Sequence, residues 1–236
     1  MSFEALARWN HRVHGPVPPL SFIPVAEASD LIVQLGENVL RAAARLIAQW
    51  QEAGLEPVPI AANVSAKQLQ LSDLPDRILR IAKDFNIPPS LIGIELTESV
   101  AMHDSARHVE KLHALRDLGM RVSVDDFGTG YSSLSYLRNL PIDTLKIDRS
   151  FVRDMNIDNS DAAIVRAIIG MASSLNLATV AEGIESREQA SQLLALGCSL
   201  GQGYYFAKPM PAENTFELLR EMQLSDTMPN RRLEVV

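Results

Sequence analysis

Side chains that can bind a cation or move a proton close most of the short apolar segments in this 236-residue chain. These segments have the length and the turn-residue borders of β-strands, and the polar residue comes at the C-terminal end. Carboxylates grouped with one amide are typical ligands of hard divalent cations, chiefly Mg²⁺ or Mn²⁺. Two adjacent aspartates could bridge one ion to a second about 3.5–4 Å away, as in two-metal phosphodiester hydrolysis. The residues are Glu4, Asn63, Glu95, Asp125, Asp126, Lys146 and Glu182, and Gln202 follows the last segment.

Each of these residues also has an ordinary structural interpretation when it is taken alone. A glutamate at a strand end and a single Lys146 are usually solvated surface groups, and Asn63 is a common turn former. Asp125-Asp126 could be part of a turn. Independent accidents should not all select the same end of a strand, so the joint pattern favours a shared site.

The elements that would position these residues alternate along the chain. The apolar segments predict strands, and the longer segments between them have helical periodicity. The predicted strands are Phe3–Leu6, Val58–Asn63, Leu91–Thr97, Arg121–Asp125, Thr144–Ile147, Ala178–Glu182 and Cys198–Gly201. The predicted helices are Asp30–Ala53, Asp73–Phe85, Ser105–Leu118, Ser133–Leu140, Ser160–Leu175, Ser186–Leu196 and Ala212–Met222.

This alternation predicts an α/β fold with parallel strands and helical crossovers. An open doubly wound sheet and a closed (β/α)8 barrel are the two main solutions, and no Gly-rich phosphate-binding turn follows an early strand to support the first. A barrel needs eight strands, and the count here is seven. We therefore expect a modified (β/α)8 TIM-type barrel from which the first strand is missing. Parallel strands of a barrel open on one face, which would bring the polar residues together.

The bulk composition is that of a globular domain, with 47% hydrophobic and 22% charged residues. We expect one domain over residues 1–224 and a flexible tail over residues 225–236. The segment Gly15–Pro19 is expected to be a rigid, irregular loop. The net charge of −7 disfavours a nucleic-acid polymer as partner, and no apolar run is long enough for a membrane segment. A single cysteine, Cys198, excludes an internal disulfide, is expected in the core, and fits a cytoplasmic location.

The same residues lie in motifs that resemble those of the EAL-domain cyclic-di-GMP phosphodiesterases. The resemblance covers residues 3 to about 220 in the order of the family, which makes it far more specific than a single short motif. Its residues are Glu4-Ala5-Leu6, Phe22–Glu27, Asn63-Val64-Ser65, Glu95–Ser99, Asp125–Ser133, Leu145–Asp148, Ala181–Glu185, Gln202-Gly203-Tyr204 and Lys208-Pro209.

The resemblance implies hydrolysis of the bacterial messenger cyclic di-GMP to linear pGpG with two Mg²⁺ or Mn²⁺ ions. Lys146 matches the lysine that holds the attacking water, and Gln202 matches a supporting site glutamine. Glu182 is expected to serve both the chemistry and the second ion. One ion would be held by Glu4, Asn63, Glu95 and Asp125, and the second by Asp125, Asp126 and Glu182.

The resemblance also implies contacts outside the metal ligands. Arg8 matches the residue that clamps a substrate phosphate, and Leu6 and Pro209 are further expected substrate contacts. Glu98 matches the acid that anchors the loop after Asp126, which the family also uses in dimer contacts. The expected partners are cyclic di-GMP, a second copy in a homodimer, and an upstream sensory or cyclase domain in a longer protein.

Two departures from the family pattern stand out. Family members carry some twenty residues before the Glu4 motif, including a first strand, so we expect unpaired edges at the Phe3–Leu6 and Cys198–Gly201 strands. Arg12 stands where the family usually has proline.

Three functions remain open at this level. The first is an active phosphodiesterase, which the complete set of matched ligands favours. The second is a non-catalytic cyclic-di-GMP receptor. The third is an unrelated metal-dependent barrel hydrolase.

Overall fold

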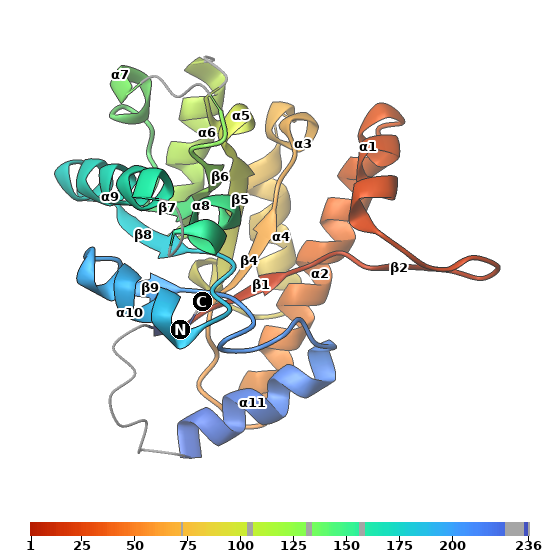
Figure 1. Cartoon of the computed structure of the whole chain (residues 1–236). Helices are drawn as coiled ribbons and strands as arrows, with labels where there is room; N and C mark the ends of the chain where they lie inside the picture. The colour runs from red at the N-terminus through yellow and green to blue at the C-terminus, as the bar shows by residue number, and fades with distance from the viewer. Residues whose placement is uncertain (72, 103–105, 131–133, 156–158, 225–233, 236) are drawn as a thin grey trace.

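The parallel strands of the chain form one curled sheet with helices around its outside (Figure 1). The computed structural model describes residues 1–71, 73–102, 106–130, 134–155, 159–224 and 234–235. The sheet has eight strands in the order β1-β4-β5-β6-β7-β8-β9-β10, and every neighbouring pair is parallel. The strands are β1 (Phe3–Ala5), β4 (Ile60–Asn63), β5 (Ile92–Thr97), β6 (Arg121–Phe127), β7 (Thr144–Ile147), β8 (Ala178–Ala181), β9 (Leu200–Gly201) and β10 (Glu234–Val235). The predicted barrel-type α/β fold is confirmed.

Helices follow most of these strands and supply the parallel crossovers. None of the described helices combines the length and the apolar composition that a bilayer span needs. The longer helices are α1 (Pro19–Ala28), α2 (Leu31–Glu52), α4 (Leu74–Asp84), α6 (Ala106–Asp117), α9 (Asn159–Ser174), α10 (Arg187–Ala195) and α11 (Ala212–Leu224). The shorter ones are α3 (Ala66–Gln70), η1 (Pro89–Leu91), α5 (Glu98–Ala101), α7 (Leu134–Leu137) and α8 (Arg149–Asp154).

The predicted strands and helices agree with these bounds to within a few residues. The largest difference is α7, which covers four residues of the eight predicted from Ser133. Ser105 and Ser133, the predicted first residues of two helices, lie outside the described residues. Cys198 is fully buried, as predicted.

The segment between β1 and α2 differs from its prediction. Gly15–Pro19 was expected to be irregular, but Gly15–Val17 forms β3 and pairs antiparallel with β2 (Trp9–His11), while Pro19 begins α1. The prediction was wrong because proline is accepted in a short edge strand and at the first position of a helix. Trp9 packs edge-on against Phe22 of α1, with ring centroids 5.8 Å apart. The hairpin and α1 project away from the sheet (Figure 1).

The two ends of the sheet also differ from each other. β1 pairs with β4 on one side only among the described residues, as expected for an edge strand. β9 was expected to have an unpaired edge, but Glu234↔Leu200 and Val235↔Gly201 pair β10 with it. Residues 225–233 and 236 lie outside the described residues, so the flexible tail predicted for 225–236 stays a prediction.

The burial of β5 fits its place inside the sheet, between β4 and β6. Ile92, Ile94 and Leu96 are fully buried and alternate with Gly93 and Glu95 along the strand. Because side chains alternate between the two faces of a strand, the three apolar residues face the helices and Gly93 and Glu95 face the inside of the sheet. The strand thereby places an acidic side chain at 3% exposure inside the barrel.

Candidate metal and active site

The pairing register places the predicted site residues on one face of the sheet. Asn63 is opposite Glu95, and Thr97 is opposite Asp125. Residues opposite each other in parallel strands share a face, as do residues two apart in one strand. Lys146 is opposite Val180, and Val180 is opposite Leu200.

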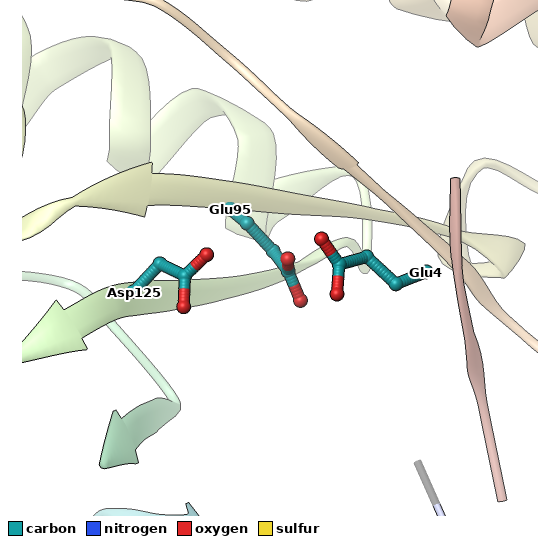
Figure 2. Close-up of side chains that lie close together, drawn as sticks. All are labelled: Glu4, Glu95 and Asp125. Carbon is teal, nitrogen blue, oxygen red and sulfur yellow. The ribbon is translucent and has the colours of Figure 1, made fainter. Parts of the chain in front are cut away.

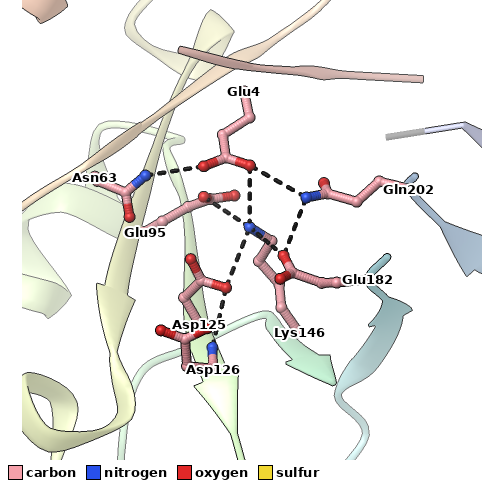
Figure 3. Close-up of polar contacts among 8 residues, drawn as sticks. All are labelled: Glu4, Asn63, Glu95, Asp125, Asp126, Lys146, Glu182 and Gln202. Atoms are coloured by element: carbon pink, nitrogen blue, oxygen red, sulfur yellow. Dashed lines mark hydrogen bonds and ion pairs between the residues drawn. The ribbon is translucent and has the colours of Figure 1, made fainter. Parts of the chain in front are cut away.

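Glu182 and Gln202 lie on the same face, although they come just after the ends of β8 and β9. Glu182 comes two residues after Val180, and Gln202 comes two residues after Leu200. Their backbone N–H groups extend the ladder, because Glu182 donates to Ile147 O at 3.1 Å and Gln202 donates to Ala181 O at 2.9 Å. All eight predicted side chains therefore gather at the C-terminal ends of the strands (Figure 3).

Carboxylates form two overlapping groups within this site. Ligand oxygens of Glu4, Glu95 and Asp125 lie within 4.8 Å of one another, and so do those of Asp125, Asp126 and Glu182. Figure 2 shows the first group, with the three side chains pointing toward one another from β1, β5 and β6. Asp125 belongs to both groups, which fits a carboxylate shared by two cations. The oxygen donors suit a hard divalent cation, so the residues could hold a metal.

The consecutive aspartates face the site because β6 is irregular there. The register of β6 with β7 shifts between Val124 and Phe127, as in a β-bulge. Asp126 has a φ of 53°, in the left-handed region that aspartate tolerates better than most residues. A bulge re-aims a side chain that would otherwise point to the opposite face. The backbone N–H of Asp126 donates to Asp125 Oδ1 at 3.0 Å.

Lys146 occupies the centre of the carboxylates. Its side chain is 2% exposed, and its Nζ atom lies close to four acidic groups. Burial alone would lower the pKa of this ammonium, but the neighbouring carboxylates, Glu95 and Glu182 foremost, raise it above the usual lysine value. The amine therefore stays charged at neutral pH. The distances from Nζ are 2.7 Å to Glu182 Oε1, 2.9 Å to Glu95 Oε2, 3.3 Å to Asp125 Oδ1 and 3.4 Å to Glu4 Oε2.

The acids respond to burial in different ways. Burial raises the pKa of Glu95 and of Glu182 to about 8, although Lys146 opposes the increase. Burial also raises the pKa of Glu4, but the charge of Lys146 and the hydrogen bonds to this carboxylate outweigh burial and hold the pKa below its usual value. Burial, together with the charge of Asp125, raises the pKa of Asp126 to about 6. Without a metal, the site therefore retains protons on some of its acids at neutral pH.

Two amides complete the polar network. Asn63 Nδ2 donates to Glu4 Oε1 at 2.9 Å. Gln202 Nε2 donates to Glu4 Oε2 at 3.2 Å and to Glu182 Oε1 at 3.1 Å. Gln202 therefore links the first strand of the chain to the loop after β8 and orients both carboxylates.

Glu98 lies beside this site, where the sequence predicted an anchor for the loop after Asp126. Glu98 is 4% exposed, and its Oε2 accepts the backbone N–H groups of Gly128 at 2.8 Å and of Gly130 at 3.3 Å. A β-carbon on Gly130 would lie 2.8 Å from Glu98 Oε1, so a larger residue at this position would force the carboxylate to shift. Glu98 therefore anchors the loop at Gly128 and Gly130, which follow Asp126 by two and four residues.

The predicted substrate contacts lie outside the network of Figure 3. Leu6 is 42% exposed directly after β1, and Pro209 is also exposed. Arg8 is exposed, and its Nη1 donates to Ala7 O at 3.0 Å. Their contacts with a phosphodiester substrate stay predictions.

Asp148 is a neighbour that the sequence analysis did not assign. It is the N-cap of α8, accepts the backbone N–H of Ser150 at 2.9 Å, and shares a hydrogen bond with the carboxyl of Asp126. The hydrogen bonds from Ser150 outweigh burial and lower the pKa of Asp148. Its position two residues after Lys146 was the available signal, since alternate residues share a face.

A curled parallel sheet with a cluster of carboxylates at the C-terminal ends of its strands defines an α/β barrel protein with a candidate cation site. The model of the EAL domain matches residues 1–209, so the chain belongs to the EAL domain family. Similar proteins of Pseudomonas aeruginosa include the bifunctional diguanylate cyclase/cyclic di-GMP phosphodiesterase MucR and the cyclic di-GMP phosphodiesterase NbdA. MucR is 45% identical over 89% of this chain and 31% of its own length. NbdA is 40% identical over 98% of this chain and 29% of its own length.

A solved structure supports the same assignment. The PaMucR phosphodiesterase in complex with c-di-GMP has a TM-score of 0.85 and 44% sequence identity, covering 90% of this chain and 86% of that chain. The chain spans less than a third of the length of MucR and of NbdA, so these relatives carry further regions.

Proposed function

We propose that this chain is a metal-dependent phosphodiesterase that hydrolyses cyclic di-GMP to linear pGpG. The observation that supports this most directly is the pair of carboxylate groups that share Asp125 around the ammonium of Lys146. Relatives named as cyclic di-GMP phosphodiesterases make this phosphodiester the first substrate to test.

Two ions, Mg²⁺ or Mn²⁺, would supply an acidified water and neutralise charge on the phosphate oxygens when bound. Glu4, Asn63, Glu95 and Asp125 would hold one of them. Asp125, Asp126 and Glu182 would hold the other. The role of this chain is then to fix these oxygens in place before substrate arrives, which the register of the sheet favours.

Lys146 would hold the attacking water and add positive charge where negative charge develops in the transition state. Its burial keeps the ammonium out of bulk water, so its electrostatic effect is larger than at a surface. Gln202 would keep Glu4 and Glu182 oriented. Arg8 would clamp a non-reacting phosphate through its planar guanidinium.

The decisive experiment is a turnover assay on the chain after removal of metals with a chelator. Adding Mn²⁺ or Mg²⁺ should restore conversion of cyclic di-GMP to pGpG. The conversion is measured by separating the two nucleotides chromatographically. Glu95→Gln should abolish turnover, whereas Glu52→Gln, an exposed change in α2, should leave it unchanged. Binding of cyclic di-GMP without any pGpG would instead make the chain a non-catalytic receptor.

The proposal extends to the setting of the domain. We propose a homodimer with contacts from the loop after Asp126. We also propose an upstream sensory or cyclase region, because the match covers only 31% of the length of MucR. A cytoplasmic location belongs to the same proposal. Light scattering on the purified chain tests the dimer, and a monomer at all concentrations would contradict it.

A further inference from the structure

The oxygens that contact Lys146 are the oxygens that a metal would need. Its Nζ atom contacts all three carboxylates of the first group, at 2.9 Å from Glu95, 3.3 Å from Asp125 and 3.4 Å from Glu4. In the second group it contacts Asp125 and Glu182, the latter at 2.7 Å. A lysine ammonium and a divalent cation would therefore compete for the same lone pairs.

Without a cation at this position, the acidic groups would repel one another. Glu4, Glu95, Asp125 and Glu182 are all at most 16% exposed, so water screens them poorly. Removing one partner of a buried ionic network leaves the other charges uncompensated. The Lys146 side chain supplies the only ammonium or guanidinium among the contacts described for these four carboxylates.

We propose that Lys146 is an internal counter-cation, which stabilises the metal-free site and weakens the binding of metal. The inference adds regulation of metal loading to the proposed function, and it rests on that function only for the identity of the metals. Without metal, the ammonium of Lys146 offsets the repulsion among the four buried carboxylates. Metal binding is weakened, because each metal must displace the ammonium from carboxylate oxygens that it already contacts.

The counter-cation role predicts an effect on metal affinity opposite to that expected if Lys146 only positions the metal ligands. If Lys146 only holds the ligands in position, its loss should weaken metal binding. If it is a counter-cation, its loss should destabilise the metal-free chain and strengthen metal binding, because no ammonium would then compete with the metal for the carboxylate oxygens.

The test compares wild type with Lys146→Met, which keeps an unbranched side chain of similar length without charge. Chelator-treated proteins are titrated with Mn²⁺ alone by calorimetry, and thermal melting is recorded with and without Mn²⁺. We expect Lys146→Met to melt at a lower temperature without metal. We expect its Mn²⁺ affinity to rise at least tenfold, equivalent to about 1.4 kcal/mol. Lys111→Met is the matched control. The Lys111 Nζ atom donates a hydrogen bond to Leu69 O at 2.7 Å and does not contact the site carboxylates described above. The Lys111→Met variant should therefore bind Mn²⁺ as tightly as wild type.

A compensating variant keeps the test decisive if Lys146→Met does not fold without metal. Glu95→Gln/Lys146→Met removes one acid together with the lysine, so its metal-free melting temperature should lie above that of Lys146→Met. Unchanged or weaker Mn²⁺ binding by Lys146→Met, or a double variant no more stable than the single one, would overturn the inference. None of these readouts uses cyclic di-GMP, so a chain without phosphodiesterase activity could still satisfy them.

Discussion

Replacing Glu98 by alanine should loosen the loop that begins at Asp126. The change removes a buried acceptor of two backbone hydrogen bonds, from Gly128 at 2.8 Å and from Gly130 at 3.3 Å. A hydrogen bond to a charged group contributes about 1.5–3 kcal/mol, and the longer bond contributes less than the shorter one. We therefore expect Glu98→Ala to lower the free energy of unfolding by about 2–4 kcal/mol.

The same change should weaken metal binding, because Asp126 lies two residues before Gly128 and has a left-handed backbone conformation. Such a conformation persists only where the surrounding contacts fix it. Urea unfolding measures the first effect, and calorimetric titration with Mn²⁺ measures the second. Glu98→Gln retains an acceptor oxygen at the same position, so it should lose less than half as much stability.

Two results would refute this reasoning. A loss below about 0.5 kcal/mol, typical of an ordinary surface substitution, would show that the carboxylate does not hold the loop. A full loss of stability with unchanged Mn²⁺ affinity would show that the loop and Asp126 are independent.

Three further predictions concern substrate, pH and backbone. Arg8→Ala should weaken the binding of cyclic di-GMP at least tenfold, or about 1.4 kcal/mol, with partial recovery in Arg8→Lys; equal affinity by calorimetry would place the phosphate elsewhere. The pKa of Glu95 and of Glu182 is raised from 4.5 to about 8, so between these values the folded chain holds protons that the unfolded chain has released. The metal-free melting temperature should therefore fall from pH 5 to pH 8, and Mn²⁺ should reduce the fall; a flat metal-free profile would contradict this. Gly203→Ala should cost about 2–4 kcal/mol, because a β-carbon there would lie 2.2 Å from Ile184 O at a φ of 152°; a melting temperature equal to that of wild type would be the contrary result.

The strands could be predicted closely because each is a short apolar segment with turn residues at its borders. β7 was predicted at its observed bounds, Thr144–Ile147, and the polar residue of each strand pointed to a common face. The gathering of Glu4, Glu95 and Asp125 followed from that single geometric rule.

Other features depend on contacts that a linear pattern does not contain. The β2–β3 hairpin has strands of three residues, and α1 contains Pro24, so neither gives a clear periodic signal. Lys146 was predicted to hold a water, but its contact with four carboxylates depends on how strongly the sheet curls. The hydrogen bond of Asp148 with Asp126 depends on the bulge in β6.

The hydrogen bond from Gln202 to Glu4 joins residues 198 positions apart in the chain. Contacts of such long range form late in folding, because the entropy of closing a long loop must be lost first. During synthesis, Glu4 leaves the ribosome long before Gln202 exists. The carboxylate cluster is therefore complete only after almost the whole barrel has been made. Fraying of β1 alone would release Glu4 and open the cluster while the rest of the sheet stays folded.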